Sequence, residues 1–229
     1  MAQKKDNSDL AKAVEIMKVE HAKGGSAEHI LNIFKAILST TPIGGFFASL
    51  IDDYLPASKE LRVEQFMTDT ANKLCDLQDQ IDTERIKTDH YAYIFEQCIR
   101  GVAQYPQQEK LECYKAILIN AAKPTKDSDE QQDYFLNLVN TLSPIDIRLI
   151  DALHRAMKIP QNGAETGLTI RSLLGNVDGD IIMSAAAELY QLQFTNTQPS
   201  SMPMTADLSR AGGRLTPIAR KFIEFCTLS

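Results

Sequence analysis

Apolar residues recur along most of the chain at the three- and four-residue spacing of amphipathic helices. The clearest case runs from Ser58 to Ile81, where the steps between seam positions are four, three, four, three and four residues. The seam positions are Val63, Met67, Thr70, Leu74, Leu77 and Ile81. This spacing is typical of a helix that packs along another helix, and the seam is too short for a free coiled coil. The pattern therefore predicts a helical bundle.

The same spacing predicts further helices in the first two thirds of the chain. They cover residues 8–23, 26–38, 41–54, 84–104, 107–122 and 130–142. Gly24 and Gly25 end the first helix and favour a hinge. We therefore expect residues 1–25 to form an amphipathic N-terminal helix with its hinge, and residues 26–142 to form a helical bundle.

A new unit is predicted to begin at Ser143. A serine cap, proline at the first helical position and Asp146 near the positive end of the helix dipole make a strong helix start. Further elements follow: helices over 144–157, 169–175 and 180–193, the β-favouring residues 194–197, and a last helix that begins at Thr216 and Pro217. Residues 143–229 are expected to be this unit.

The order of these C-terminal elements resembles that of winged-helix domains. The segment Leu215-Thr216-Pro217-Ile218-Ala219-Arg220 is similar to the "LTPxGR" segment that precedes the final helix in many bacterial members, with Ala219 where glycine is common. The resemblance implies a winged-helix-like domain with a small β-wing. The expected fold class is therefore mainly α, a helical bundle followed by this domain.

Charge argues against the usual use of such a domain. In DNA-binding members the helix that corresponds to residues 180–193 enters the major groove, where cations hold phosphates. Here no lysine or arginine occurs between Arg171 and Arg210, and the helix with its approach carries Asp178, Asp180 and Glu188. Because carboxylates repel phosphates, this pattern favours a protein-interaction module. Its apolar residues, expected to divide between the domain core and a partner, are Ile181, Ile182, Met183, Leu189 and Leu192.

An alternative is a dimeric winged-helix transcriptional regulator that binds DNA. Its phosphate contacts would come from the surrounding cations, which are Arg171, Arg210, Arg214, Arg220 and Lys221. The helical bundle would then serve dimerisation or sensing. The competing interpretation of these cations is a solvated face with local carboxylate partners.

The N-terminal part carries a second resemblance. The run Thr41-Pro42-Ile43-Gly44-Gly45, the segment from Leu50 to Pro56 and the segment Arg62-Val63-Glu64-Gln65-Phe66 are similar to a pattern in small helical prokaryotic proteins, including abortive-infection proteins of the alpha type. The resemblance implies a role in a prokaryotic defence or stress system and supplies no chemistry.

Four apolar residues in this region are candidates for contact with a partner or a membrane. They are Phe46, Phe47, Leu50 and Ile51, beside glycines and other small residues that allow close helix approach. They would contact a protein partner or a second copy of the chain, or would insert into a membrane if the protein were a toxin-like effector. The alternative is that they fill the core of the bundle.

Composition and motifs narrow the remaining function classes. Hydrophobic residues make up 44% of the chain, and the net charge of −6 arises in residues 1–143, which hold 16 Lys and Arg against 22 Asp and Glu. The charged first 25 residues argue against a secretory signal, and the four separated cysteines indicate reduced thiols, so we expect a cytoplasmic protein. No phosphate-binding loop, nucleophile motif or metal-ligand spacing occurs. We therefore expect a non-enzymatic protein without cofactor or metal.

Overall fold

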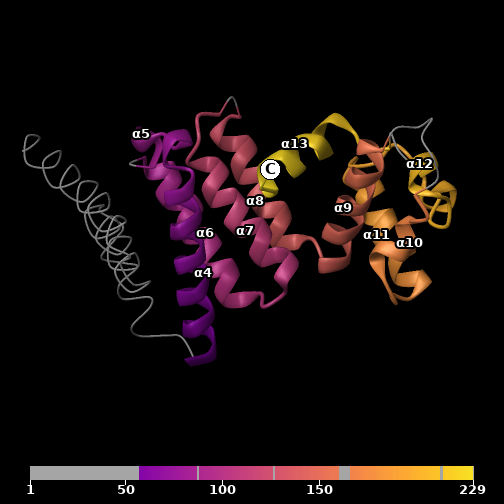
Figure 1. Cartoon of the computed structure of the whole chain (residues 1–229), viewed down its shortest axis with the longest axis horizontal. Coiled ribbons are helices and arrows are strands. Elements are labelled where there is room, and N and C mark those ends of the chain that lie inside the picture. The colour runs from indigo at the N-terminus through magenta and orange to yellow at the C-terminus, as the bar shows by residue number, and fades with distance from the viewer. Residues whose placement is uncertain (1–56, 87, 126, 160–165, 212–213, 229) are drawn as a thin grey trace, which may run out of the picture. The chain divides into compact units, whose positions relative to one another are not determined.

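The computed structural model describes residues 57–86, 88–125, 127–159, 166–211 and 214–228, which are mainly helical (Figure 1). The helices expected over 8–23, 26–38 and 41–54, and the hinge at Gly24 and Gly25, lie outside these residues. The described residues form two compact units. Unit 1 consists of residues 57–106 and 118–129, and unit 2 consists of residues 107–117 and 130–228. The expected boundary at residue 143 stays a prediction.

In unit 1, the long helix α4 (Ala57–Asp76) packs along α6 (Asp89–Gln104). The first three seam positions of α4, Val63, Met67 and Thr70, are buried as the spacing predicts. Thr70 is the one polar member, and its hydroxyl donates to the carbonyl oxygen of Phe66 at 2.7 Å. This bond satisfies the hydroxyl within the helix, so the threonine methyl group packs in the seam without an unpaired polar atom.

The chain between these two helices is more broken than the two helices expected over 58–81 and 84–104. Instead of helices to Ile81 and from residue 84, α4 ends at Asp76 and is followed by η1 (Gln78–Gln80) and α5 (Thr83–Ile86). The backbone N–H of Asp82 donates to the carbonyl oxygen of Ala122 at 2.8 Å, and its carboxylate accepts from the N–H of Glu84 at 3.0 Å. Thr88 then caps α6. These bonds stop the helix locally, and hydrophobic spacing does not encode them.

Two arginines of unit 1 satisfy the carbonyl groups that helices leave open at their C-terminal ends. Arg62 of α4 donates through Nε to Val102 at 2.8 Å and through Nη2 to Ala103 at 2.7 Å, near the end of α6. Arg85 of α5 donates through Nε to the carbonyl oxygen of Ala121 at 3.1 Å. Unit 1 is thus stabilised by hydrogen bonds at its helix ends as well as by its apolar core.

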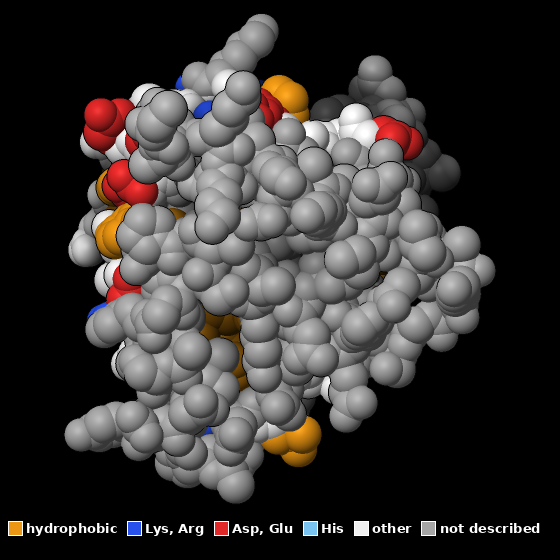
Figure 2. Space-filling model, turned by 90° about the vertical axis from the view of Figure 1, so that its left-hand side faces the viewer, with side chains coloured by type: hydrophobic (Ala, Val, Ile, Leu, Met, Phe, Trp, Pro, Cys, Tyr) orange, Lys and Arg blue, Asp and Glu red, His pale blue; other side chains and the backbone are white. Residues whose placement is uncertain are grey.

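In Figure 2, Asp and Glu side chains (red) are more prominent than Lys and Arg (blue) among the described residues on the face shown.

Unit 2 is arranged around α9 (Pro144–Lys158). Each of four later helices packs against it: α10 (Ile170–Leu174), α11 (Gly179–Gln191), α12 (Leu208–Ala211) and α13 (Pro217–Cys226). The remaining elements are α8 (Asp129–Thr141), η2 (Pro199–Ser201) and the first ten residues of α7 (Gln108–Ala121). The sequence predicts all of these helices within a few residues except η2 and α12, which lie between residue 197 and Thr216, where no helix was expected.

The start of α9 has the capping geometry that its sequence predicts. Ser143 accepts from the N–H of Asp146 at 3.3 Å, and the Asp146 carboxylate accepts from the N–H of Ser143 at 2.7 Å. Pro144 follows the cap. The last helix, α13, likewise begins with Thr216 as its cap and Pro217 as its first residue. In both helices the capping side chain accepts from a backbone N–H group of the first turn, which has no partner within the helix.

Four phenylalanines join α8, α13 and the segment after α11 in the core of unit 2. The ring of Phe222 lies 5.7 Å from that of Phe135 and 5.1 Å from that of Phe194, measured between ring centroids. Phe225 lies 6.0 Å from Phe135. Phe135 and Phe194 are fully buried, and Phe222 is nearly so. The aromatic core therefore fixes α13 within the unit.

β-type pairing in the described residues is limited to two isolated antiparallel bridges, and no strand is formed there. One bridge pairs Thr169 with Asp207, and the other pairs Thr195 with Leu215. The N–H of Thr216 donates to the carbonyl oxygen of Phe194 at 3.0 Å beside the second bridge. The described residues thus contain the mainly helical part of the expected fold, without the β-wing. None of the described helices has the length and apolar content needed to cross a membrane.

We expect Phe222→Ala to lower the free energy of unfolding of unit 2 by about 3–5 kcal/mol, because it removes an aromatic side chain from a closely packed core. Urea denaturation followed by circular dichroism measures this loss. Lys221→Ala, at the exposed neighbouring position, is the control and should change stability by less than about 0.5 kcal/mol. Equal losses in the two variants would contradict the assigned core.

Candidate functional site

Helix α11 has one buried and one exposed face. Its buried residues are Ile182, Ala185, Ala186 and Leu189, and the helix packs against α9 and η2. The opposite side carries exposed residues, which we call the α11 outer face: Asp180, Ile181, Met183, Ser184, Glu188, Tyr190 and Gln191. Since the buried face holds the helix in the unit, the outer face is available for contacts with another molecule.

Three large apolar side chains of this face are exposed to solvent. The exposed fraction is 52% for Ile181, 37% for Met183 and 40% for Tyr190. The apolar residues of this segment were expected to divide between the core and a partner. Ile182 and Leu189 are buried in the core, whereas Ile181 and Met183 are exposed. Tyr190 was not among the residues that the sequence singled out, although its spacing of seven from Met183 places it on the same side of the helix.

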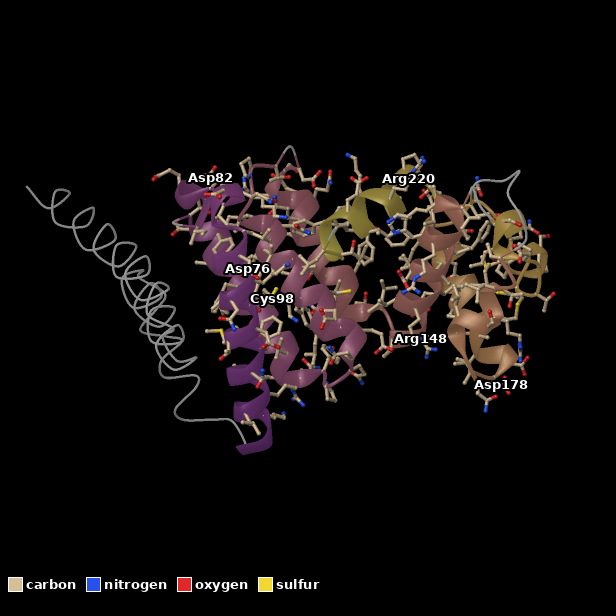
Figure 3. All side chains as sticks on the ribbon, in the orientation of Figure 1. Asp76, Asp82, Cys98, Arg148, Asp178 and Arg220 are labelled. Atoms are coloured by element: carbon tan, nitrogen blue, oxygen red, sulfur yellow. The ribbon has the colours of Figure 1, made fainter. Side chains whose placement is uncertain are left out.

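The N-terminal end of α11 is already satisfied by carboxylate. Asp178 is the cap, and its side chain accepts from the N–H of Asp180 at 2.7 Å (Figure 3). Negative side chains at this end stabilise the helix through its dipole. A β-carbon placed on Gly179 would lie 3.5 Å from Nη1 of Arg171, so this arginine lies beside the same end. The carboxylates of Asp178 and Asp180 therefore already lie at the start of α11, which leaves no open site for an anion.

Glu188, near the other end of the outer face, lies in an environment that disfavours its charged form. Burial and the neighbouring carboxylate of Asp146 raise its pKa. Asp146 is only 1% exposed, and while its Oδ2 accepts from Ser143, its Oδ1 has no hydrogen-bond partner. The exposed Glu188 is thus coupled electrostatically to a buried carboxylate of α9.

One buried cation faces Asp146 from inside unit 2. Lys110 of α7 is 4% exposed, and its Nζ donates to the carbonyl oxygen of Asn140 at 2.9 Å. Burial lowers the pKa of Lys110, while the charges of Cys113 and Asp146 act in the opposite direction. The lysine closes the C-terminal end of α8, so its ammonium group serves the fold and is inaccessible from the α11 outer face. Sequence spacing alone did not identify either Lys110 or Asp146 as buried.

The cations proposed for phosphate contact are spread over several elements. Arg171 is exposed on α10, and Arg220 and Lys221 are exposed on α13. Arg214 is half-buried and donates through Nη1 to the hydroxyl of Thr197 at 3.0 Å. Arg210 belongs to α12, but its side chain is outside the described residues. In Figure 3 the labelled Arg220 lies far from Asp178, next to which Arg171 approaches Gly179, so the structure does not bring Arg171 and Arg220 into one cluster.

The cysteine side chains among the described residues are buried. Cys98, Cys113 and Cys226 are free thiols in the interior, whereas the side chain of Cys75 is outside the described residues. Burial raises the pKa of Cys113 to about 12 and that of Cys98 well above its usual value, so both thiols are protonated near neutral pH. Within the described part of the chain no group of three or more His, Cys, Asp and Glu side chains could hold a metal ion.

The other predicted contact residues, Phe46, Phe47, Leu50 and Ile51, lie outside the described residues. Comparison of the chain with protein-family models, with curated proteins and with solved structures finds no match. Both resemblances drawn from the sequence therefore stay predictions, and the α11 outer face is the candidate site that the described residues support.

We expect Glu188→Gln to change the pH dependence of stability. A raised pKa means that the unfolded chain loses the Glu188 proton at a lower pH than the folded protein does, so wild-type stability falls relative to the glutamine variant as pH rises above about 4.5. Below that pH both side chains are neutral and the difference vanishes. Urea denaturation of both proteins at pH 4 and pH 7 measures it, and a variant that is less stable than wild type at pH 7 alone would contradict the raised pKa.

Proposed function

We propose that the chain is a non-enzymatic protein-interaction module whose C-terminal, winged-helix-like unit presents the α11 outer face to a protein partner. The observation that carries this proposal is the division of α11 into a buried face and an exposed face with three large apolar side chains and no lysine or arginine. Met183 and Tyr190 lie on one edge of this face and Ile181 on the other, and exposed large apolar side chains occur at protein-binding surfaces. Tyrosine and methionine are also enriched in the centres of such surfaces.

The winged-helix part of the proposal is supported by the order of elements in unit 2. Helices α9, α10 and α11 follow one another, and α13 begins at Thr216 and Pro217. The bridge between Thr195 and Leu215 joins the segment after α11 to the segment before α13, where the hairpin of a wing would start. In such a fold α11 holds the place of the groove-reading helix, and its acidic outer face would make that helix a protein contact.

The proposal of a non-enzymatic role is supported by Cys98 and Cys113, whose thiols are buried and protonated near neutral pH and so are poor nucleophiles. The biological setting that we propose is a prokaryotic defence or stress system in the cytoplasm. That part rests on the resemblance carried by Thr41 to Gly45 and by Arg62 to Phe66.

A DNA-binding regulator is the second candidate, favoured by one observation: Arg171, Arg220 and Lys221 are exposed and could contact phosphates. We expect the protein to show no tight, steeply salt-dependent binding to random duplex DNA between about 50 and 200 mM salt, because its groove-facing helix is acidic. Fluorescence anisotropy with a labelled duplex measures this. A loss of affinity of about a hundredfold or more over that range, reduced by Arg220→Ala, would favour the regulator instead.

The protein-interaction role is tested by site-specific photo-crosslinking in the native cells. We expect a photo-reactive phenylalanine at Ser184, in the middle of the α11 outer face, to give a discrete adduct with another protein. Adding Ile181→Asp should abolish the adduct, because a charge is placed within the apolar contact. The matched control carries the same photo-reactive residue at Lys221 on α13. Adducts that form equally at both positions, or that persist with Ile181→Asp, would refute the role of α11.

A further inference from the structure

Residues 198–211 of unit 2, which we call the strap, contain little regular structure of their own. They include η2, which has three residues, and α12, which has four. The turns between these helices are closed by local bonds, such as that from the N–H of Met204 to the carbonyl oxygen of Met202 at 2.9 Å. Helices this short are not stable alone. The strap therefore depends on its contacts with the rest of unit 2.

The strap contacts three helices of unit 2. Its helix η2 packs against α11, and its helix α12 packs against α9. Between these two contacts, the carbonyl oxygen of Met204 accepts from the N–H of Arg171 in α10 at 2.9 Å. Two strap side chains, Met202 and Leu208, are buried, with exposed fractions of 7% and 1%. If the strap moved away as a whole, these contacts would be lost together and both side chains would meet solvent.

One carboxylate, that of Asp207, joins the strap to the loop that precedes α10. Its Oδ2 accepts from the N–H of Gly167 at 2.8 Å and from the hydroxyl of Thr166 at 3.1 Å. Its Oδ1 accepts from the N–H of Ser209 at 2.9 Å and from the hydroxyl of Ser209 at 2.7 Å. The hydrogen bonds from Ser209 above all hold the pKa of Asp207 below its usual value, so the carboxylate is ionised at neutral pH. One oxygen thus serves the loop and the other serves the strap.

The backbone around Asp207 depends on the same junction. Asp207 forms an isolated bridge with Thr169, and the N–H of Leu208 donates to the carbonyl oxygen of Leu168 at 2.9 Å. Ser209 is only 4% exposed, so removal of the Asp207 carboxylate would leave two buried donors without their acceptor. The carboxylate therefore stabilises the closed position of the strap from both sides of the junction.

We propose that the strap opens as one unit while the helical core of unit 2 stays folded, and that the Asp207 carboxylate is the latch that holds it closed. Opening exposes Met202 and Leu208 and uncovers the part of α11 that packs against η2. Segments with few regular hydrogen bonds open at lower free energy than a helical core, and mobile binding elements are drawn from such segments. The inference does not depend on what α11 binds.

Amide hydrogen exchange of the full chain, measured by NMR in low concentrations of urea, tests the opening. The N–H groups of Arg171 and Leu208 bond across the edge of the strap and do not bond the Asp207 side chain, so they report on the whole strap. We expect both to share one opening free energy with a shallow dependence on urea, because little surface is exposed. Leu153, buried in α9, should show a higher free energy and a steep dependence. The inference fails if Arg171 and Leu208 follow Leu153, or if they differ from each other.

Variants of Asp207 test the latch. Asp207→Ala should speed exchange of the Arg171 and Leu208 amides about tenfold, because the closed state loses the carboxylate bonds. Asp207→Asn keeps one acceptor oxygen but turns a donor toward Gly167, so it should give a smaller acceleration at both amides.

Thr205→Ala is the matched control. Thr205 is an exposed strap residue that makes no side-chain hydrogen bond among the described residues, so this variant should change the two rates by less than about twofold. Circular dichroism confirms that each variant is folded. If Asp207→Ala speeds exchange at Gly167 and Ser209 alone, or if Thr205→Ala has the same effect as Asp207→Ala, Asp207 is not the latch of the strap and the inference is overturned.

Discussion

The packing of α9 is the interaction on which the rest of unit 2 depends. Ser143, Pro144 and Asp146 start this helix, and α10, α11, α12 and α13 each pack against it. Helix α11 can use only one face for that contact, namely the face of Ile182, Ala185, Ala186 and Leu189. The candidate site follows from this constraint, because the same packing that orders α11 leaves its other side in solvent.

Charge then determines what the exposed side can bind. Asp178 and Asp180 stabilise the helix start through the dipole, so acidic residues there serve the fold. Glu188 has no such benefit, because burial and the Asp146 carboxylate disfavour its charged form. The exposed carboxylates of this helix would repel DNA phosphates.

The sequence predicted much of the helical architecture, because its strongest signals are local. Caps at Ser143 and Thr216 and the seam from Val63 to Thr70 appear in the structure where the spacing placed them. The end of α4 at Asp76 and the short helices η1 and α5 were not predicted, because the bonds in this segment include one between Asp82 and Ala122, which are far apart in the chain.

The candidate site was predictable only in outline. The absence of cations between Arg171 and Arg210 and the outward position of Ile181 and Met183 follow from composition and helical period. The burial of Lys110 and Asp146 was not predicted, because it arises from the packing of α7 against segments distant in sequence. The buried Asp146 carboxylate also helps to raise the pKa of Glu188, an effect that helical spacing does not predict.

The most direct test of this account is a methyl NMR titration of the full chain with the photo-crosslinked partner, once it is identified, and separately with duplex DNA. The methyl signals of Ile181 and Met183 report on the α11 outer face, and that of the buried Ile182 is the internal reference. The account predicts that the partner shifts the signals of Ile181 and Met183 well beyond that of Ile182, and that DNA leaves all three unchanged. Shifts of Ile181 and Met183 with DNA, or none with the partner, would contradict it.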